Sequence, residues 1–288
     1  MEKYQNPILK HISIREELEV PLFTFPLLEE TGIVRHCFTT RLGGVSEGIF
    51  STMNLSFSRG DKKEAVEENY KRLAEALSVE YDSFVCSNQT HTTNVIRVGK
   101  EDVEGCGVFC GAAQNTREEK YQDVDGMVTN EAGVTLITYY ADCVPLYFAD
   151  PVHHAIGLSH SGWRGTAARM GKATLEKMKQ EFSTEPEDVI CAIGPSICQN
   201  CYEVSEDVAD VFQKEFAGRE KEILVNKGEG KYLLDLWKAN EIVLTDAGVA
   251  PSHLAVTEIC TCCHPRLLFS HRASKGKRGN LAAALALK

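Results

Sequence analysis

Hydrophobic positions recur every three to four residues in several segments of the chain, which predicts amphipathic helices. The clearest segment is 166–182, where Met170, Thr174 and Met178 fall on one helical face. The same spacing indicates further helices at residues 62–77, 205–216 and 236–247. Gly248 follows the last of these, at a position where glycine commonly ends a helix.

Short runs rich in Val, Ile and Tyr, bounded by turn residues, predict strands between these helices. They occur at residues 34–40, 84–86, 95–98, 127–129, 135–140, 145–149, 155–159, 189–193, 232–235 and 267–270. The runs at 84–86 and 95–98 are expected to pair with each other. So many strands interleaved with helices favour a single α/β domain with a mixed central β-sheet and helices packed on its faces.

Two segments lack this patterning. Residues 1–32 are expected to form an N-terminal lead-in, because prolines at positions 7, 21 and 26 interrupt regular structure. The domain itself is expected at residues 33–288. Residues 100–124 are charged, rich in Gly and Cys, and without apolar periodicity. They predict a long loop of the kind that is functional or mobile.

Composition places the protein among soluble globular domains, with 43% hydrophobic and 25% charged residues. The formal net charge of −10, without a long Lys/Arg run, argues against a nucleic-acid partner. No apolar run approaches the roughly 20 residues of a membrane span. The polar N-terminus lacks the apolar core of a secretory signal. A cytoplasmic location away from membranes is therefore expected.

Eleven cysteines is a high and odd number, so complete disulfide pairing is impossible. In a reducing compartment such residues are buried, bind metal or act as nucleophiles. Cys198 and Cys201 have CxxC spacing, and Cys260, Cys262 and Cys263 form a second group. Together they could build a structural zinc site. Because the second group reads as CxCC, buried free thiols are the favoured interpretation.

Three short stretches each place one metal ligand between a strand and a loop: His91, Cys143 and His160. Two imidazoles and one thiolate suit a catalytic zinc ion that keeps one position open. Taken singly, each residue also fits an ordinary loop histidine or a buried cysteine. Asp142, beside Cys143, could orient an imidazole or accept a proton. It fits equally well as a carboxylate that caps the end of a strand.

Two arginines are candidates for binding an anion. Arg164 precedes the helix expected from residue 166, whose N-terminus offers unpaired N–H groups for a phosphate beside His160. In the alternative interpretation Trp163 packs on the sheet and Arg164 forms a structural ion pair. Arg41 is followed by a Gly-Gly pair that allows close approach of the backbone to a ligand.

The sequence motifs around these residues resemble those of the laccase-domain, or YfiH-like, family in order and content from residue 38 to residue 272. They read FTTRLGGVS, QTHTTNV, DVDGMVTN, YYADCVPLYFAD, HAIGLSHSGWRGTAARM, AIGPSICQNCYEV and CTCCHPRLLFSHR. The resemblance implies a fold related to Cys/His deamidases. It also implies zinc ligation by His91, Cys143 and His160, and places Arg41 at the active site. His271 departs from the tyrosine usual in the family, whereas Arg272 fits.

Members of that family are described as purine nucleoside phosphorylases that also deaminate adenosine, and earlier as multicopper polyphenol oxidases. The resemblance thus implies a zinc enzyme acting on adenosine, inosine, guanosine and S-methyl-5′-thioadenosine with phosphate. The single set of two histidines and one cysteine predicts one zinc ion per chain. Arg41, Asp142 and Arg164 are the expected catalytic residues beside the metal. Whether the protein is a monomer or a homodimer stays open.

Other functions compete with this interpretation. Cys143 and His160 could form a metal-free thiol–imidazole pair for amide hydrolysis, and a zinc amidase acting on cell-wall precursor peptides is a related option. A copper oxidase of phenols is disfavoured, because few of the nine histidines cluster in the sequence. A non-catalytic binding protein is disfavoured by the intact ligand set.

Overall fold

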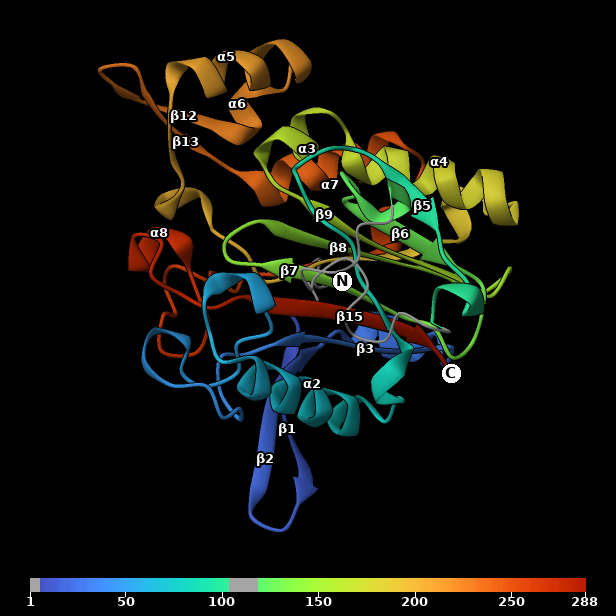
Figure 1. Cartoon of the computed structure of the whole chain (residues 1–288). Helices are drawn as coiled ribbons and strands as arrows, with labels where there is room; N and C mark the ends of the chain where they lie inside the picture. The colour runs from blue at the N-terminus through green and yellow to red at the C-terminus, as the bar shows by residue number, and fades with distance from the viewer. Residues whose placement is uncertain (1–5, 104–118) are drawn as a thin grey trace.

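Two six-stranded sheets packed face to face form the centre of the protein, and helices cover their outer faces (Figure 1). The computed structural model describes residues 6–103 and 119–288. Both sheets mix parallel and antiparallel neighbours. The expected α/β domain with helices on its faces is confirmed, although its strands divide into two large sheets and a small third one rather than a single sheet. None of the helices in the described part of the chain is long and apolar enough to cross a membrane.

The two sheets draw their strands from the whole chain. The first has the order β1 (Ile8–Arg15), β2 (Leu18–Thr24), β3 (Val34–Thr39), β15 (Leu281–Leu287), β7 (Thr135–Tyr140) and β4 (Phe84–Val85). The second has the order β14 (Leu254–Val256), β10 (Ile190–Ile193), β8 (Val144–Asp150), β9 (Ala155–Ser161), β6 (Gly126–Thr129) and β5 (Val95–Arg97). Strands β7 and β15 of the first sheet pack on β9 of the second.

Burial on both faces explains the sequences of the central strands. Every residue of β8 and β9 is buried, so these strands read as nearly continuous apolar runs instead of alternating ones. Phe38, Leu136 and Leu285 from the first sheet meet Tyr147 and Leu158 from the second in one apolar core. This core fixes how the two sheets lie relative to each other.

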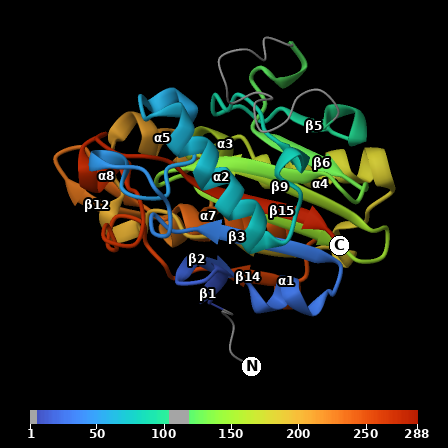
Figure 2. The ribbon, with the colours of Figure 1, turned by 60° about the horizontal axis from the view of Figure 1, so that its bottom comes forward.

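Helix α2 (Lys63–Leu77) covers the outer face of the first sheet (Figure 2). Its Val66, Tyr70 and Leu73 are buried there. Helices α4 (Met170–Phe182) and α7 (Leu236–Asp246) cover the second sheet. A smaller unit at one end contains the sheet β11 (Glu203–Ser205), β13 (Lys231–Leu234) and β12 (Leu224–Gly228) with α5 (Glu206–Glu215) and α6 (Glu220–Ile223).

The single helix expected at residues 166–182 is divided. A short helix α3 (Trp163–Ala167) begins earlier than expected, and α4 follows it. Arg169 between them has a φ of 65°, in the left-handed region that a continuous helix does not contain. The anion site expected beside Arg164, at the start of a long helix, therefore lies instead at the short helix α3 of five residues.

The expectation of an irregular lead-in is wrong, because β1 and β2 are paired strands of the first sheet and α1 (Pro26–Glu30) follows them. The prolines are accommodated locally. Pro21 lies outside the two residue pairs that join β2 to β3, so its missing N–H costs no bond between those strands. Pro26 occupies the first turn of α1, where helices tolerate proline.

Two other expectations need correction, and a third concerns residues that the structure describes only in part. Strands β4 and β5 do not pair with each other, since β4 pairs with β7 and β5 with β6. Residues 267–270 are not a strand, and the helix α8 (His271–Ser274) follows them. Within the loop expected at 100–124, short 3-10 turns form at Lys100–Asp102 and Glu119–Tyr121. Residues 104–118 lie outside the described residues.

Candidate metal centre

The three sequence-predicted ligands meet where the chain passes from one sheet to the other. Cys143 lies in the turn that leads from β7 in the first sheet to β8 in the second. His160 is near the end of β9, and His91 lies in the loop between β4 and β5. The Sγ atom and one nitrogen of each imidazole all lie within 4.8 Å of one another. Cys143 Sγ is 3.8 Å from His91 Nε2, and the two imidazole centroids are 4.9 Å apart.

Asp125, directly before β6, positions both histidines. Its buried carboxylate accepts a hydrogen bond of 2.7 Å from His160 Nδ1 and one of 3.1 Å from the main-chain N–H of His91. The main-chain N–H groups of Thr90 and Thr92 and the Thr92 hydroxyl complete its contacts. Because Nδ1 of His160 is engaged, Nε2 is the nitrogen left for a metal.

Sequence reasoning did not single out Asp125, although it lies in the quoted word DVDGMVTN. An acidic residue just before a strand reads as part of a turn. What marks this one is its contact with a loop more than thirty residues away, and only the fold shows that contact.

The electrostatics of the group favour a charged thiolate. Burial opposes ionisation of Cys143, but the charge of His160 and hydrogen bonds from His160 and His91 outweigh it and lower its pKa to about 6. Burial also opposes protonation of His160, but Cys143 and Asp125 outweigh it and raise its pKa to about 9. Burial likewise disfavours the charged form of Asp125, yet the hydrogen bond and charge of His160 hold its pKa below the usual value.

The donor set fits one zinc ion. A thiolate and two imidazoles are ligands that zinc prefers, and three protein ligands leave one position for substrate or water. The space around the ligands is tight on one side. A Cβ atom at Gly162 would lie 2.6 Å from His91 Cδ2 and 3.2 Å from Cys143 Sγ, so glycine is required there.

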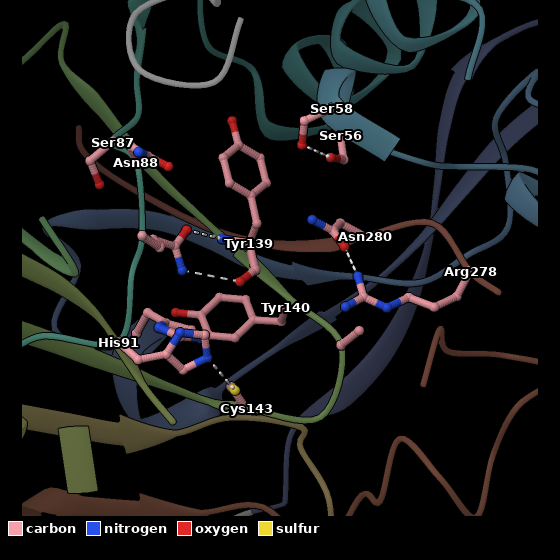
Figure 3. Close-up of a pocket in the computed structure, with 13 residues that line it drawn as sticks. Ser56, Ser58, Ser87, Asn88, His91, Tyr139, Tyr140, Cys143, Arg278 and Asn280 are labelled. Atoms are coloured by element: carbon pink, nitrogen blue, oxygen red, sulfur yellow. Dashed lines mark hydrogen bonds between the residues drawn. The ribbon is translucent and has the colours of Figure 1, made fainter. Parts of the chain in front are cut away.

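A cavity of about 260 Å³ opens beside the ligands (Figure 3). It is lined by His91, Cys143 and His160 together with Tyr139, Tyr140, Asn88, Arg278, Asn280 and several small polar residues. Figure 3 shows Arg278 and Asn280 facing the cavity across from His91 and Cys143. The ligands thus face an open space that is large enough for a small molecule.

Arg278 supplies a cation to this cavity. Its Nη1 donates to the side chain of Asn280 and to the carbonyl of Gly279. Its Nε is buried and has no hydrogen-bond partner among the described residues. Burial lowers the pKa of Arg278 to about 10, so it remains charged at neutral pH. Sequence reasoning did not single out this residue, which lies in the short basic segment 275–278.

Asp142 is turned away from the imidazoles. Its carboxylate accepts a 2.7 Å hydrogen bond from the Thr261 hydroxyl and another of 2.7 Å from the main-chain N–H of Arg272. Its φ of 93° lies in the left-handed region that a non-glycine residue adopts only under local constraint. These contacts join Asp142 to two neighbouring loops and involve neither imidazole, so its expected role beside the metal stays a prediction.

Arg41 and Arg164 are not among the residues that line the cavity. Arg41 donates from Nε to the carbonyl of Ser51 and from Nη1 to that of Pro265, both at 2.8 Å. Its guanidinium also lies over the ring of Phe269. Arg164 is exposed and stacks on Trp163 at 4.2 Å. A direct role of these two arginines in binding phosphate stays a prediction.

The cysteines of the two other groups match the expectation of buried free thiols only in part. Cys260 is buried, but Cys198, Cys201 and Cys262 are half-buried and Cys263 is exposed. Four of them, Cys198, Cys201, Cys260 and Cys263, have their sulfur atoms within 4.8 Å of one another. The structure therefore brings together the two cysteine groups that the sequence holds far apart.

Comparison with known proteins places the chain in a family. The model of the family described as multi-copper polyphenol oxidoreductase laccase matches residues 35–288. The chain belongs to this laccase family. The crystal structure of YlmD from Geobacillus stearothermophilus superposes with a TM-score of 0.84 at 34% identity, covering 97% of this chain and all of that one. The Bacillus licheniformis protein YfiH superposes with the same TM-score at 30% identity, covering 93% of this chain and 96% of that one.

Curated relatives of this laccase-family chain are named as enzymes. A protein of Geobacillus stearothermophilus named purine nucleoside phosphorylase YlmD is 37% identical over 85% of this chain and 87% of its own length. One of Bacteroides thetaiotaomicron named purine nucleoside phosphorylase is 35% identical over 88% of this chain and 91% of its own. The family description names copper, whereas the names of these relatives specify phosphorolysis.

Proposed function

We propose that the protein is a zinc-dependent purine nucleoside phosphorylase of the cytoplasm, with adenosine deaminase activity as a second reaction. Its proposed substrates are phosphate and adenosine, inosine, guanosine or S-methyl-5′-thioadenosine. The observation that carries the proposal is that the His91–Cys143–His160 group and the Arg278 guanidinium line one cavity. The names of the relatives support the same reaction class.

Phosphorolysis needs an anion site next to the sugar. A phosphate oxygen forms a bond to C1′ of the ribose while the bond from C1′ to N9 of the purine breaks. The purine leaves with the bonding electron pair, and ribose 1-phosphate remains. Arg278 suits the phosphate because it lines the cavity and its planar guanidinium can donate two parallel hydrogen bonds.

The remaining residues hold the metal and shape its surroundings. Zinc held by Cys143, His91 and His160 would supply Lewis acidity toward a substrate oxygen and acidify a bound water, which deamination at C6 of adenosine also needs. Asp125 keeps the proton of His160 on Nδ1 and holds the His91 loop in place. Arg41 and Asp142 fix the loops that border the centre, through Pro265 and Thr261.

Two alternatives rest on the same residues. The lowered pKa of Cys143 beside His160 is what a thiol nucleophile for amide hydrolysis needs, so a metal-free amidase is the second candidate. Copper oxidase chemistry has less support. Within residues 6–103 and 119–288, one gathered ligand group contains histidine, whereas a multicopper enzyme needs several copper sites.

The decisive assay incubates zinc-loaded protein with adenosine, with and without phosphate, and separates adenine, hypoxanthine and inosine by chromatography. We expect adenine only when phosphate is present, and inosine in either case. No phosphate-dependent release of adenine, hypoxanthine or guanine from any of the proposed nucleosides would overturn the phosphorylase assignment. No inosine from adenosine would remove the deaminase.

Arg278 variants test the anion site itself. Arg278→Gln should lower kcat/KM for phosphate by about ten- to a hundredfold, because a charge-assisted hydrogen bond contributes about 1.5–3 kcal/mol. Arg278→Lys should recover only part of this loss, since lysine lacks the planar fork. Arg35→Gln is the matched control, because Arg35 lies on β3 and does not line the cavity. Equal effects of the Arg278 and Arg35 variants would exclude the proposed phosphate contact.

A further inference from the structure

A second set of metal ligands lies outside the proposed active site. Cys198 and Cys201 belong to the loop after β10, and Cys260 and Cys263 to the loop after β14. Strands β10 and β14 are parallel neighbours, so their following loops leave the same edge of the second sheet. The fold thereby places two CxxC segments side by side. The intervening Cys262 is what makes the second segment read as CxCC in the sequence.

The distances between the sulfur atoms suit one tetrahedral ion. Cys263 Sγ is 3.5 Å from Cys201 Sγ and 4.0 Å from Cys198 Sγ, and all four sulfurs lie within 4.8 Å of one another. Four sulfurs about 2.3 Å from a central zinc ion would be about 3.8 Å apart. The separations are too long for disulfide bonds, whose sulfurs are about 2.0 Å apart.

Main-chain N–H groups also point at one of these sulfurs. Cys260 Sγ lies 3.3 Å from the main-chain N of Cys198 and 3.4 Å from that of Cys263. Such N–H contacts stabilise a negatively charged sulfur, as ligand sulfurs in a metal site are. One N–H donor comes from each of the two loops, so both loops are arranged to stabilise a negative charge on Cys260 Sγ.

We propose that Cys198, Cys201, Cys260 and Cys263 bind one structural Zn²⁺ ion, in addition to the ion at His91, Cys143 and His160. Four thiolate ligands close the coordination shell and leave no position for substrate, which is typical of structural rather than catalytic zinc. The assignment does not depend on the reaction that the first centre catalyses.

The contacts of the two loops indicate what this ion stabilises. In the second loop, Thr261 donates to Asp142, and the carbonyl of Pro265 accepts from Arg41. In the first loop, the carbonyl of Cys201 accepts from Arg272, whose main-chain N–H also donates to Asp142. The ion would therefore clamp together two loops that hold the residue preceding the Cys143 ligand.

Metal counting separates the two centres. Protein expressed with zinc and desalted stringently should contain two zinc ions per chain by elemental analysis. Cys143→Ser and Cys263→Ser should each retain one, and the double variant none. Cys262→Ser is the matched control, because Cys262 lies next to the cluster but outside it, and this variant should retain two. One zinc ion in the wild type, unaffected by Cys263→Ser, would overturn the proposal.

Two further measurements protect the test against variants that fold poorly. Cobalt substituted into metal-depleted wild-type protein should give the strong thiolate-to-metal absorption of a tetrathiolate site. That absorption should persist in Cys143→Ser and disappear in Cys263→Ser. Cys263→Ser should also unfold at a lower temperature than Cys262→Ser. Iron bound by the four cysteines of purified protein would overturn the assignment to zinc. If wild-type protein contained two zinc ions but catalysed no phosphorolysis, the result would contradict the proposed function and leave the structural zinc site supported.

Discussion

Replacing Asp125 with asparagine tests whether one buried carboxylate organises the metal centre. In the native protein its Oδ1 accepts from His160 Nδ1 and the His91 N–H, and its Oδ2 accepts from the Thr90 and Thr92 N–H groups and the Thr92 hydroxyl. Asparagine keeps one oxygen and turns the other acceptor into a donor. Its least costly orientation places the NH₂ group at the Oδ1 position, facing the N–H groups of both histidine residues.

The expected loss follows from this count. Two hydrogen bonds to a buried group disappear, one of them to a charged partner, at a cost of about 2–4 kcal/mol shared between folding and metal binding. Loss of a group that orients a metal-bound histidine typically weakens metal affinity about ten- to a hundredfold. Asp125→Asn should therefore bind zinc at the first centre at least tenfold more weakly than the wild type.

The assay is competition for zinc with a chelator of known affinity, alongside thermal unfolding of the metal-free proteins. It is carried out in the Cys263→Ser background, so that only the first centre is measured. Asp123→Asn is the control, since the exposed Asp123 accepts a hydrogen bond from the Thr90 hydroxyl but contacts neither histidine. If Asp125→Asn bound zinc as tightly as Asp123→Asn, Asp125 would have no part in holding the ligands.

Two further predictions follow from single contacts. Iodoacetamide should label Cys143 slowly in zinc-loaded protein and faster after chelation, as followed by mass spectrometry, and rapid labelling of active, metal-free enzyme would favour the amidase. Burial lowers the pKa of His36 to about 4 from 6.5, so the unfolded chain binds its proton more readily. Stability should therefore fall by up to about 3 kcal/mol as the pH drops from 6.5 to 4, and denaturant titrations of His36→Gln should show a smaller fall.

The three candidate metal ligands could be named from the sequence because each lies in a distinctive sequence motif. His91, Cys143 and His160 are brought together as expected. Asp125 and Arg278 could not be identified in the same way. One reads as a turn residue and the other as part of a basic run, and their roles depend on contacts between segments far apart in the chain.

In the fold, too, elements set by local sequence could be predicted, whereas an element set by distant neighbours could not. Helices with a clear apolar face, such as α2 and α7, lie where the spacing predicts them. Strand β15 gave no signal, because its sequence LAAALAL is rich in alanine and leucine, which favour helices. It is a strand because its neighbours β3 and β7 supply hydrogen bonds on both sides in a fully buried position. The CxxC spacing of Cys260 and Cys263 was also hard to recognise, because Cys262 lies between them and makes the segment read as CxCC.

The place of β15 has a consequence for the order in which the protein matures. This strand inserts between β3 and β7, and Ala283 pairs with Phe38 from the other end of the chain. Contacts so distant in sequence form slowly. Arg278 lies just before β15, so the cavity gains its cation only when that strand is in position. A chain that has gathered His91, Cys143 and His160 but not yet inserted β15 could take up metal without being able to hold phosphate. Under the proposed function, the capacity to bind zinc and the capacity to bind phosphate would then arise at separate stages of folding.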